Sequence, residues 1–392
     1  MQADPRPESP RAAPRASRCA CGHQLFFDDG RCPGCGQPVG YLLAHRALYR
    51  LRRDAGTDTW TPDAAAAAVH PPSGWRRCAN HDSPAACNWL IAPAPTAPSG
   101  TLCRACRLNR TIPDLSQDRL ALLWSRMERA KRRVVSQLVG LGLPVADRVA
   151  EDPAHGIAFD FLSALPGQAP VSTGHADGIV TVDVEEADDA VRERTREAMG
   201  EPYRTLVGHF RHELGHYYWA RLIQGSDLEA PCRQVFGDER ADYRAALEAN
   251  RAHGPPPGWS RSHVSAYASV HPAEDWAESW AHYLHMRDTL ETAGRVGIVD
   301  DPLAIDAGPF GADDLWDPRA PDAHDFVAMV RRWQRLVGAM NEMSHAMGQP
   351  DFYPFALPHA ALAKLQFIHG AIERARHAAA SRAGDATDAG TD

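Results

Sequence analysis

The sequence predicts an α+β protein with a short Cys-rich front part and a longer, mainly helical body. Eight of the nine cysteines lie between residues 19 and 106, and the body contains several long segments with apolar residues at helical spacing. Strand-like segments near 157–184 precede most of these helices. Short strands combined with long helices are typical of folds in which helices cover a small sheet.

The composition excludes several classes of protein. The 392 residues, 44% hydrophobic and 23% charged, are ordinary for a globular protein of two or three domains. No stretch approaches the roughly 18 uncharged apolar residues of a membrane span, and the start of the chain lacks the apolar segment of a signal peptide. Cysteines without a secretory signal favour a reducing compartment, so we expect a cytoplasmic bacterial protein with no membrane partner.

The charge is unevenly distributed along the chain. Residues 1–150 carry 21 Arg and Lys against 12 Asp and Glu, although the whole chain has a net charge of −8. A basic front part is compatible with nucleic-acid binding, but thiolates bound to zinc would remove part of the excess.

Three stretches of low complexity divide the chain. Residues 1–18 are rich in Pro, Arg, Ala and Ser, and residues 377–392 are rich in Ala, Asp and Gly, so both ends are predicted to be disordered tails. The Ala- and Pro-rich stretch 54–74 predicts a linker. Between them lie two Cys-rich segments at 19–53 and 75–116 and the body at 117–376.

The first four cysteines form two close pairs. Cys19 and Cys21 are separated by one residue, and Cys32-Pro-Gly-Cys35 is followed by Gly36, the pattern of a zinc knuckle. Glycine permits the turn that directs backbone amides at the sulfurs, and four thiolates complete a tetrahedral zinc shell. We therefore expect a structural zinc ribbon here, with disulfides as the alternative. The single residue between Cys19 and Cys21 departs from the usual knuckle.

The second set consists of Cys78, Cys87, Cys103 and Cys106. Its tight pair favours a second structural zinc, although the gap between the first two members is irregular and His81 is an alternative ligand. Arg104, Arg107 and Arg110 lie beside the set. These arginines are compatible with a nucleic-acid or protein partner for the ribbon. The alternative is that the ribbon has a purely structural role. Cys232 stands apart and is interpreted as a small buried hydrophobic residue.

The body is predicted from its hydrophobic periodicity and its turn residues. The expected elements are a helix at 120–141, a strand at 157–161, a hairpin at 171–184 with its turn at 174–178, and helices at 202–223, from Pro272 to about 292, at 323–346 and at 358–376.

The clearest chemical signal is His212-Glu213-Leu214-Gly215-His216. Residues four apart share one face of a helix, so both imidazoles can bind one metal ion. Glu213 would then act as general base towards the water that the metal activates. In a zincin, an edge strand above this helix aligns an extended peptide, and Ile179–Val184 is the candidate for that strand. The alternative is an ordinary His-Glu pair on a structural helix.

A catalytic zinc needs a third protein ligand and an open position for water. Glu274 and Glu278 lie one turn apart in the helix that begins at Pro272. We expect Glu274 to bind the metal and Glu278 to orient a motif histidine, as in glutamate-ligand zincins, with the reverse assignment as the alternative.

Other residues compete for roles at the site. Asp238, Glu239 or Asp242 could supply the third ligand, or could cap and orient a helix beneath the site. Tyr267 is either an oxyanion donor or a packed aromatic residue. His209 is interpreted as a neighbour of the site or an exposed residue. The remaining histidines of this region are expected to be surface or hydrogen-bonded core residues: His263, His271, His282 and His285.

Three long motifs together resemble a known family. The Cys103–Leu115 segment, Gly208-His-Phe-Arg-His-Glu-Leu-Gly-His-Tyr-Tyr-Trp219 and His271-Pro-Ala-Glu-Asp-Trp-Ala-Glu-Ser-Trp-Ala-His-Tyr-Leu-His285 follow the N-terminal ribbon. This order is similar to that of the bacterial "putative zinc-binding metallopeptidase" family. The resemblance covers nearly everything between the tails. It implies a zinc hydrolase and does not specify the substrate.

The sequence therefore predicts zinc-ribbon modules followed by a zincin-like body of the gluzincin type. One catalytic zinc at His212, His216 and Glu274 and two structural zincs would be bound, and a peptide or protein would be the substrate. The alternative is a nucleic-acid- or protein-binding adaptor with a structural body. A third hypothesis is a zinc amidase that hydrolyses amide bonds other than peptide bonds.

Overall fold

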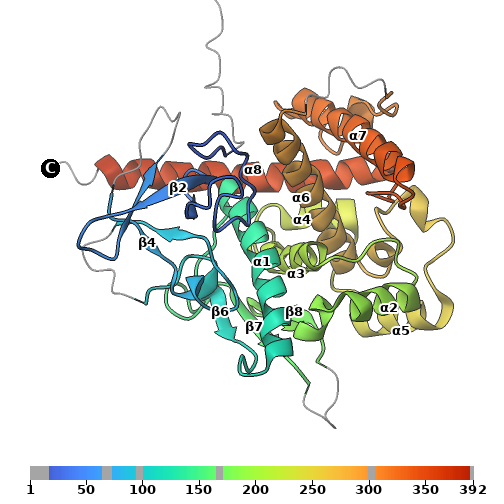
Figure 1. The fold of residues 1–392 in the computed structure, drawn as a ribbon. Coiled ribbons are helices and arrows are strands. Elements are labelled where there is room, and N and C mark those ends of the chain that lie inside the picture. The colour runs from blue at the N-terminus through green and yellow to red at the C-terminus, as the bar shows by residue number, and fades with distance from the viewer. Residues whose placement is uncertain (1–16, 64–72, 94–99, 165–170, 299–304, 389–392) are drawn as a thin grey trace, which may run out of the picture.

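The computed structural model describes residues 17–63, 73–93, 100–164, 171–298 and 305–388 (Figure 1). Within these ranges the chain forms small sheets at the Cys-rich end and a body of eight α-helices around a mixed sheet. One cluster of buried side chains extends from the cysteines through the body to the last helix. None of the helices in the described part of the chain has the length and apolar character needed to cross a membrane.

The Cys-rich region contains two small antiparallel sheets. The first consists of β1 (Val39–Leu42), β2 (Ala47–Arg53) and β3 (Trp60–Asp63), and the second of β4 (Arg76–Arg77) and β5 (Leu90–Ile91). Residues 60–63, which the composition predicted as part of a linker, therefore belong to a sheet. Residues 64–72 of that stretch, and residues 1–16 of the expected N-terminal tail, lie outside the described residues.

The body contains a four-stranded sheet in the order β6-β7-β9-β8. Its strands are β6 (Asn109–Thr111), β7 (Ala158–Leu162), β8 (Gly174–Ala176) and β9 (Ile179–Asp183). β6, β7 and β9 run parallel, whereas β8 is antiparallel to β9. Because β6 begins shortly after Cys106, the second cysteine set is joined directly to the sheet of the body.

The prediction for the edge strand is wrong. We expected Ile179–Val184 to border the metal-binding helix, but β9 lies between β7 and β8, and β8 is the edge strand that contacts this helix. The hairpin turn is made by Asp177 and Gly178, with φ of 48° and 79°, so Gly174 is in the strand and not in the turn. The sequence of a hairpin does not specify which of its two strands pairs with the rest of the sheet.

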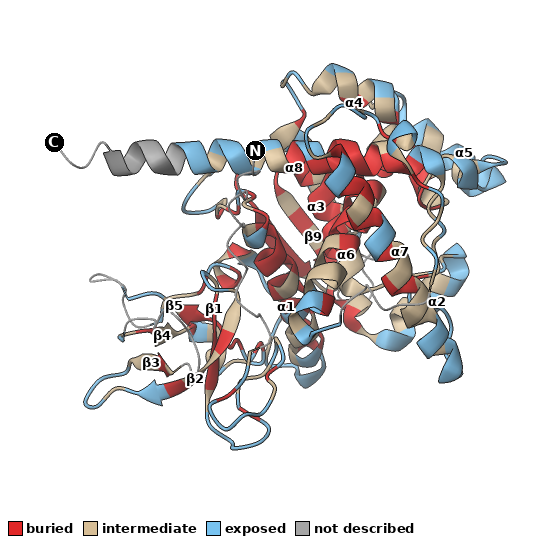
Figure 2. Ribbon diagram, turned by 90° about the horizontal axis from the view of Figure 1, so that it is seen from above, coloured by how far each residue is buried: buried red, intermediate tan, exposed pale blue. Residues whose placement is uncertain are grey.

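The helices pack against one another and against this sheet (Figure 1). They are α1 (Asp118–Gly140), α2 (Asp189–Met199), α3 (Leu206–Leu222), α4 (Glu229–Phe236), α5 (Tyr243–His253), α6 (Pro272–Val296), α7 (Ala323–Ala346) and α8 (His359–Asp388). Burial is concentrated on α1, α3, α6 and the first part of α8, while the far end of α8 extends away from the body (Figure 2).

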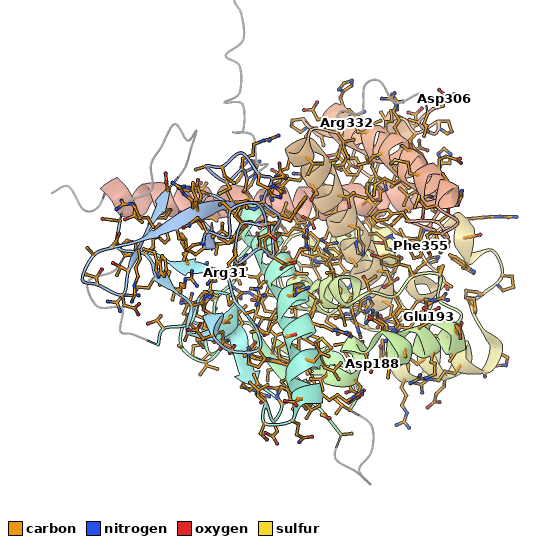
Figure 3. All side chains as sticks on the ribbon, viewed as in Figure 1. Arg31, Asp188, Glu193, Asp306, Arg332 and Phe355 are labelled. Carbon is orange, nitrogen blue, oxygen red and sulfur yellow. The ribbon has the colours of Figure 1, made fainter. Side chains whose placement is uncertain are left out.

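Most of the long helices lie where the sequence predicted them, and the differences have simple reasons. The sequence did not predict α2, α4 or α5; α2 and α5 have no buried residue that could mark an apolar face. The N-terminus of α2 is capped by Asp188 and its C-terminus by Gly200 at φ 64°. Asp188 and Glu193 lie along this exposed helix (Figure 3). α3 begins at Leu206 and not at residue 202. α8 continues to Asp388, although we expected a disordered tail from residue 377, and residues 389–392 lie outside the described part.

The Cys-rich region packs on the body through buried polar groups. Lys131 on α1 forms a fully buried ion pair of 2.5 Å with Glu128 and also donates to the side chain of Asn109. Glu128 Oε2 lies 3.6 Å from Cys106 Sγ. The same few atoms therefore connect the second cysteine set, strand β6 and helix α1.

A second contact joins the first sheet to the far end of α6. Arg46, in the turn between β1 and β2, pairs with Glu291 at 2.8 Å. Tyr41 on β1 is hydrogen-bonded to Ser136 on α1 at 2.5 Å. These contacts fix the orientation of the Cys-rich region on the body.

We predict that Lys131→Met destabilises the protein by about 3–5 kcal/mol, because it leaves Glu128 buried without its cation. The free energy of unfolding can be measured by urea titration with tryptophan fluorescence. Arg244→Met is the control, because Arg244 pairs with Glu248 on the surface and its loss should change stability little. Equal effects of the two substitutions would contradict the prediction.

Candidate metal centre

Each set of four cysteines converges on one point. In both sets the four Sγ atoms lie within 4.8 Å of one another. The measured Sγ–Sγ distances are 3.6 Å for Cys19–Cys35, 3.6 Å for Cys21–Cys32 and 3.7 Å for Cys87–Cys103. Four thiolates at the usual Zn–S distance of about 2.3 Å are about 3.8 Å apart in a tetrahedron. The two sets are therefore spaced for zinc.

The neighbours of the second set have other partners. His81 Nδ1 lies 3.1 Å from the carbonyl oxygen of Cys87, and the residue is not part of the four-sulfur cluster. Arg107 pairs with Glu151 at 2.6 Å, and Arg110 pairs with Asp160. Of the three arginines noted in the sequence, only Arg104 has no ion pair within the described ranges. Cys232 is buried, as expected for a lone cysteine.

The metal-binding motif lies on α3, packed tightly against α6. Thr205 caps the helix by accepting a hydrogen bond from the Gly208 amide. Gly215, between the two histidines, lies so close to α6 that a Cβ there would be 3.0 Å from Ala277 Cα. Trp276 Nε1 donates to the Gly215 carbonyl at 2.8 Å. A side chain at this position would therefore push the two helices apart.

Three ligand atoms from these two helices face one another. His212 Nε2 lies 3.3 Å from His216 Nε2 and 3.0 Å from Glu274 Oε2, and His216 Nε2 lies 3.7 Å from Glu274 Oε2. Tetrahedral ligands about 2.0 Å from zinc are about 3.3 Å apart, close to all three distances.

Glu274 supplies a second argument for a metal. The residue is 1% exposed, and its Oε2 atom is buried without a hydrogen-bond partner. A buried carboxylate oxygen without a partner is costly. A cation between Oε2 and the two imidazole nitrogens would satisfy all three atoms at once, so the residues present fit a zinc ion.

Glu278 and Ser265 support the first histidine. Glu278 Oε1 lies 2.7 Å from His212 Nδ1, and Glu278 Oε2 accepts a hydrogen bond of 2.6 Å from Ser265 Oγ. A donor Nδ1–H leaves the lone pair on Nε2, the atom that faces Glu274 and His216. Both oxygens of Glu278 are thus engaged away from the three-ligand cluster.

Neighbouring histidines keep two carboxylates at the site in their ionised form. Burial raises the pKa of Glu213, but the interaction with His209 and the charges of His212 and His216 lower it to about 2. Burial also raises the pKa of Glu278, and the contact with His212 outweighs it and brings the pKa to about 2. These carboxylates are therefore ionised at neutral pH.

Two tyrosines approach the cluster from outside the motif. Tyr243 at the start of α5 donates a hydrogen bond of 2.7 Å to Glu274 Oε1, so it occupies the oxygen that does not face the histidines. Tyr267 lies against the His212 ring, with centroids 5.9 Å apart. The sequence offered no signal for Tyr243 beyond its position beside the acidic segment 238–242.

The competing residues lie elsewhere. Asp238, which we expected near the site, is half exposed and pairs with Arg240 at 2.7 Å, and Glu239 pairs with Arg233 at 2.5 Å. Asp242 accepts a hydrogen bond from Ala245 N and caps α5. None of these carboxylates faces the three-ligand cluster. The cap that Asp242 provides for α5 agrees with the alternative that one of them caps and orients a helix, whereas Asp238 pairs with Arg240 and supports neither alternative.

The remaining histidines have structural contacts. His271 caps α6, and His263 faces Asp275 at 3.6 Å. His282 is hydrogen-bonded to Tyr353, and His285 Nδ1 lies 2.7 Å from Arg211. None of them belongs to a group of potential metal ligands within the described residues.

These clusters are those of a zinc-binding protein, with a Cys-rich region ahead of a mainly helical body that carries the His-Glu cluster. The chain belongs to the family described as "Putative zinc-binding metallo-peptidase", whose model matches residues 121–371, and a zinc-ribbon domain model matches residues 16–117. Uncharacterized proteins of Mycobacterium tuberculosis and Mycobacterium bovis are each 39% identical over 354 residues, 90% of this chain and 93% of the relative. No solved structure matches the chain.

We predict about three zinc ions per chain in the wild type and about two in Glu274→Ala, because the substitution opens one site and leaves the cysteine sites intact. Elemental analysis of the purified protein measures both values. Glu248→Ala on exposed α5 is the matched control and should retain about three. A wild-type value near two that Glu274→Ala does not change would show that the His-Glu cluster holds no tight metal.

A second prediction concerns Tyr243. Removing its hydroxyl in Tyr243→Phe frees Glu274 Oε1 to rotate, and supporting hydrogen bonds of this kind contribute about 10–100-fold to metal affinity. Competition with a chromogenic chelator measures the affinity of the most weakly bound zinc. Tyr49→Phe in the Cys-rich region serves as the control. Equal affinities in the two variants would show that Tyr243 does not orient the ligand.

Proposed function

We propose that this protein is a zinc-dependent peptidase of the gluzincin type, with a zincin-like body. The proposal rests above all on the tetrahedral spacing of three ligand atoms from α3 and α6. Glu213, a buried glutamate, lies on α3 between the two histidines. His212, His216 and Glu274 would hold the ion. Zinc acts in such sites as a Lewis acid, which lowers the pKa of water towards about 7 and stabilises negative charge on oxygen.

The protein supplies proton transfer and orientation. Glu213 follows His212 on α3, is 6% exposed and is ionised, so it can accept a proton from water and later donate it to the leaving amine. Glu278 keeps His212 in one tautomer. Tyr267 would donate a hydrogen bond to the oxyanion that forms on the substrate carbonyl.

The substrate would bind as an extended strand. β8 is the last strand of its sheet and contacts α3, which carries the metal motif. The outer edge of β8 therefore offers backbone groups to a peptide that adds to the sheet. This arrangement favours a peptide or unfolded protein segment as the substrate over a small amide.

We predict that Glu213→Gln abolishes hydrolysis while zinc content stays at the wild-type value, because the amide cannot accept the proton. Labelled casein and a peptide library analysed by mass spectrometry serve as substrates. The matched control is Glu248→Gln on α5, which should retain full activity. Retained hydrolysis in Glu213→Gln would remove Glu213 from the mechanism. A wild-type protein that binds about three zincs and cleaves no peptide would contradict the proposed function.

A further inference from the structure

His209 lies between two carboxylates that come from different parts of the chain. It precedes Glu213 by one helical turn, so the two side chains share a face of α3. His209 Nε2 lies 3.2 Å from Glu213 Oε1, and His209 Nδ1 lies 2.5 Å from Glu186 Oε2. An imidazole ring that donates from both nitrogens is an imidazolium. The ring therefore bridges two anions as a cation.

Glu186 is itself held in place. It lies in the short 3₁₀ helix η3 (Val184–Ala187) that follows β9. Its Oε1 atom accepts a hydrogen bond of 2.6 Å from Thr173 Oγ1, and Arg204 approaches its Oε2 at 3.6 Å. Thr173 Oγ1 also accepts from the Asp183 amide at 3.1 Å. The carboxylate is thus fixed to the two chain segments that flank the β8–β9 hairpin.

Glu213 has few other restraints. In the described part of the chain, no side chain other than His209 forms an ion pair or hydrogen bond with it. One oxygen faces the imidazolium, and the other is left for water. The orientation of this carboxylate therefore depends on a ring that is anchored from the opposite side by Glu186.

We propose that His209 is a positioning residue, which holds the Glu213 carboxylate through an ion-pair chain from Glu186 and thereby couples the base to the edge-strand hairpin. The inference rests on the proposed function in one respect, namely that Glu213 is the base. The Glu186–His209–Glu213 chain itself is independent of a metal and of a substrate.

Four charged or titratable side chains lie around His209. They are Glu186 on η3, Arg204 ahead of α3, and Glu213 and His212 on α3 itself. Burial lowers the pKa of His209, but the charge of Glu186 and the contacts with both carboxylates raise it to about 9. The ring is therefore protonated at neutral pH.

The first test is nuclear magnetic resonance of the full-length protein with ¹⁵N-labelled histidine, assigned with His209→Leu. We expect both nitrogens of His209 to carry protons at pH 7 in the wild type. Glu186→Gln removes one negative charge and keeps the shape of the side chain. In this variant the His209 ring should lose its second proton at a lower pH than in the wild type. A neutral His209 at pH 7 in the wild type would overturn the proposal, whether or not the protein hydrolyses peptides.

The second test separates positioning from binding. His209→Leu should lower kcat about 10–100-fold with KM unchanged on the fastest-cleaved library peptide, the range typical of supporting residues. Zinc content should stay at the wild-type value. The control His324→Leu changes an exposed histidine on α7 and should have full activity. If His209→Leu does not fold, Glu186→Gln gives the same comparison.

The outcomes distinguish the two proposals. Unchanged kcat in a folded His209→Leu protein would overturn the positioning role, and so would loss of zinc, because it would assign His209 to the metal site and not to the base. A wild-type protein without peptidase activity would contradict the proposed function. The protonation of His209 would still decide whether the ion-pair chain exists.

Discussion

The site depends on the close packing of α3 against α6. Gly215 has no side chain to separate the helices, and Trp276 of α6 donates to its carbonyl. This contact brings Glu274 within 3.0 Å of His212, although the two residues are far apart in the sequence. Neither helix alone offers three ligands. The candidate metal site is therefore a property of the interface, and any substitution that separates these helices should weaken it.

Three of the chemical groups at the site are held by neighbouring side chains. Glu278 fixes His212, Tyr243 of α5 fixes Glu274, and His209 connects Glu213 to a segment beside the edge strand. Buried polar groups that lack partners are costly, so these contacts stabilise the fold as well as orient the ligands. The one buried oxygen without a partner in this group, Glu274 Oε2, is the atom that faces both histidines.

The Cys-rich region is attached to the body at more than one point. Its second cysteine set leads directly into β6, the first strand of the body sheet, and touches the buried Glu128–Lys131 pair. Arg46 contacts α6 near its C-terminal end, about 20 Å along the helix from Glu278 at a rise of about 1.5 Å per residue. This contact with α6 therefore lies at a distance from the candidate site.

The sequence by itself determined the features that depend on local spacing: the paired cysteines, two histidines on one helical face, and the limits of long amphipathic helices such as α1 and α7. It could not select the edge strand, because strand order depends on pairing between distant segments. It also left Asp238 open as a competing ligand or supporting residue, whereas the carboxylate of Asp238 pairs with Arg240. Only the tertiary structure brought Tyr243 and Glu186 to the site, because hydrogen bonds between side chains about 20 or more residues apart leave no periodic signal in the sequence.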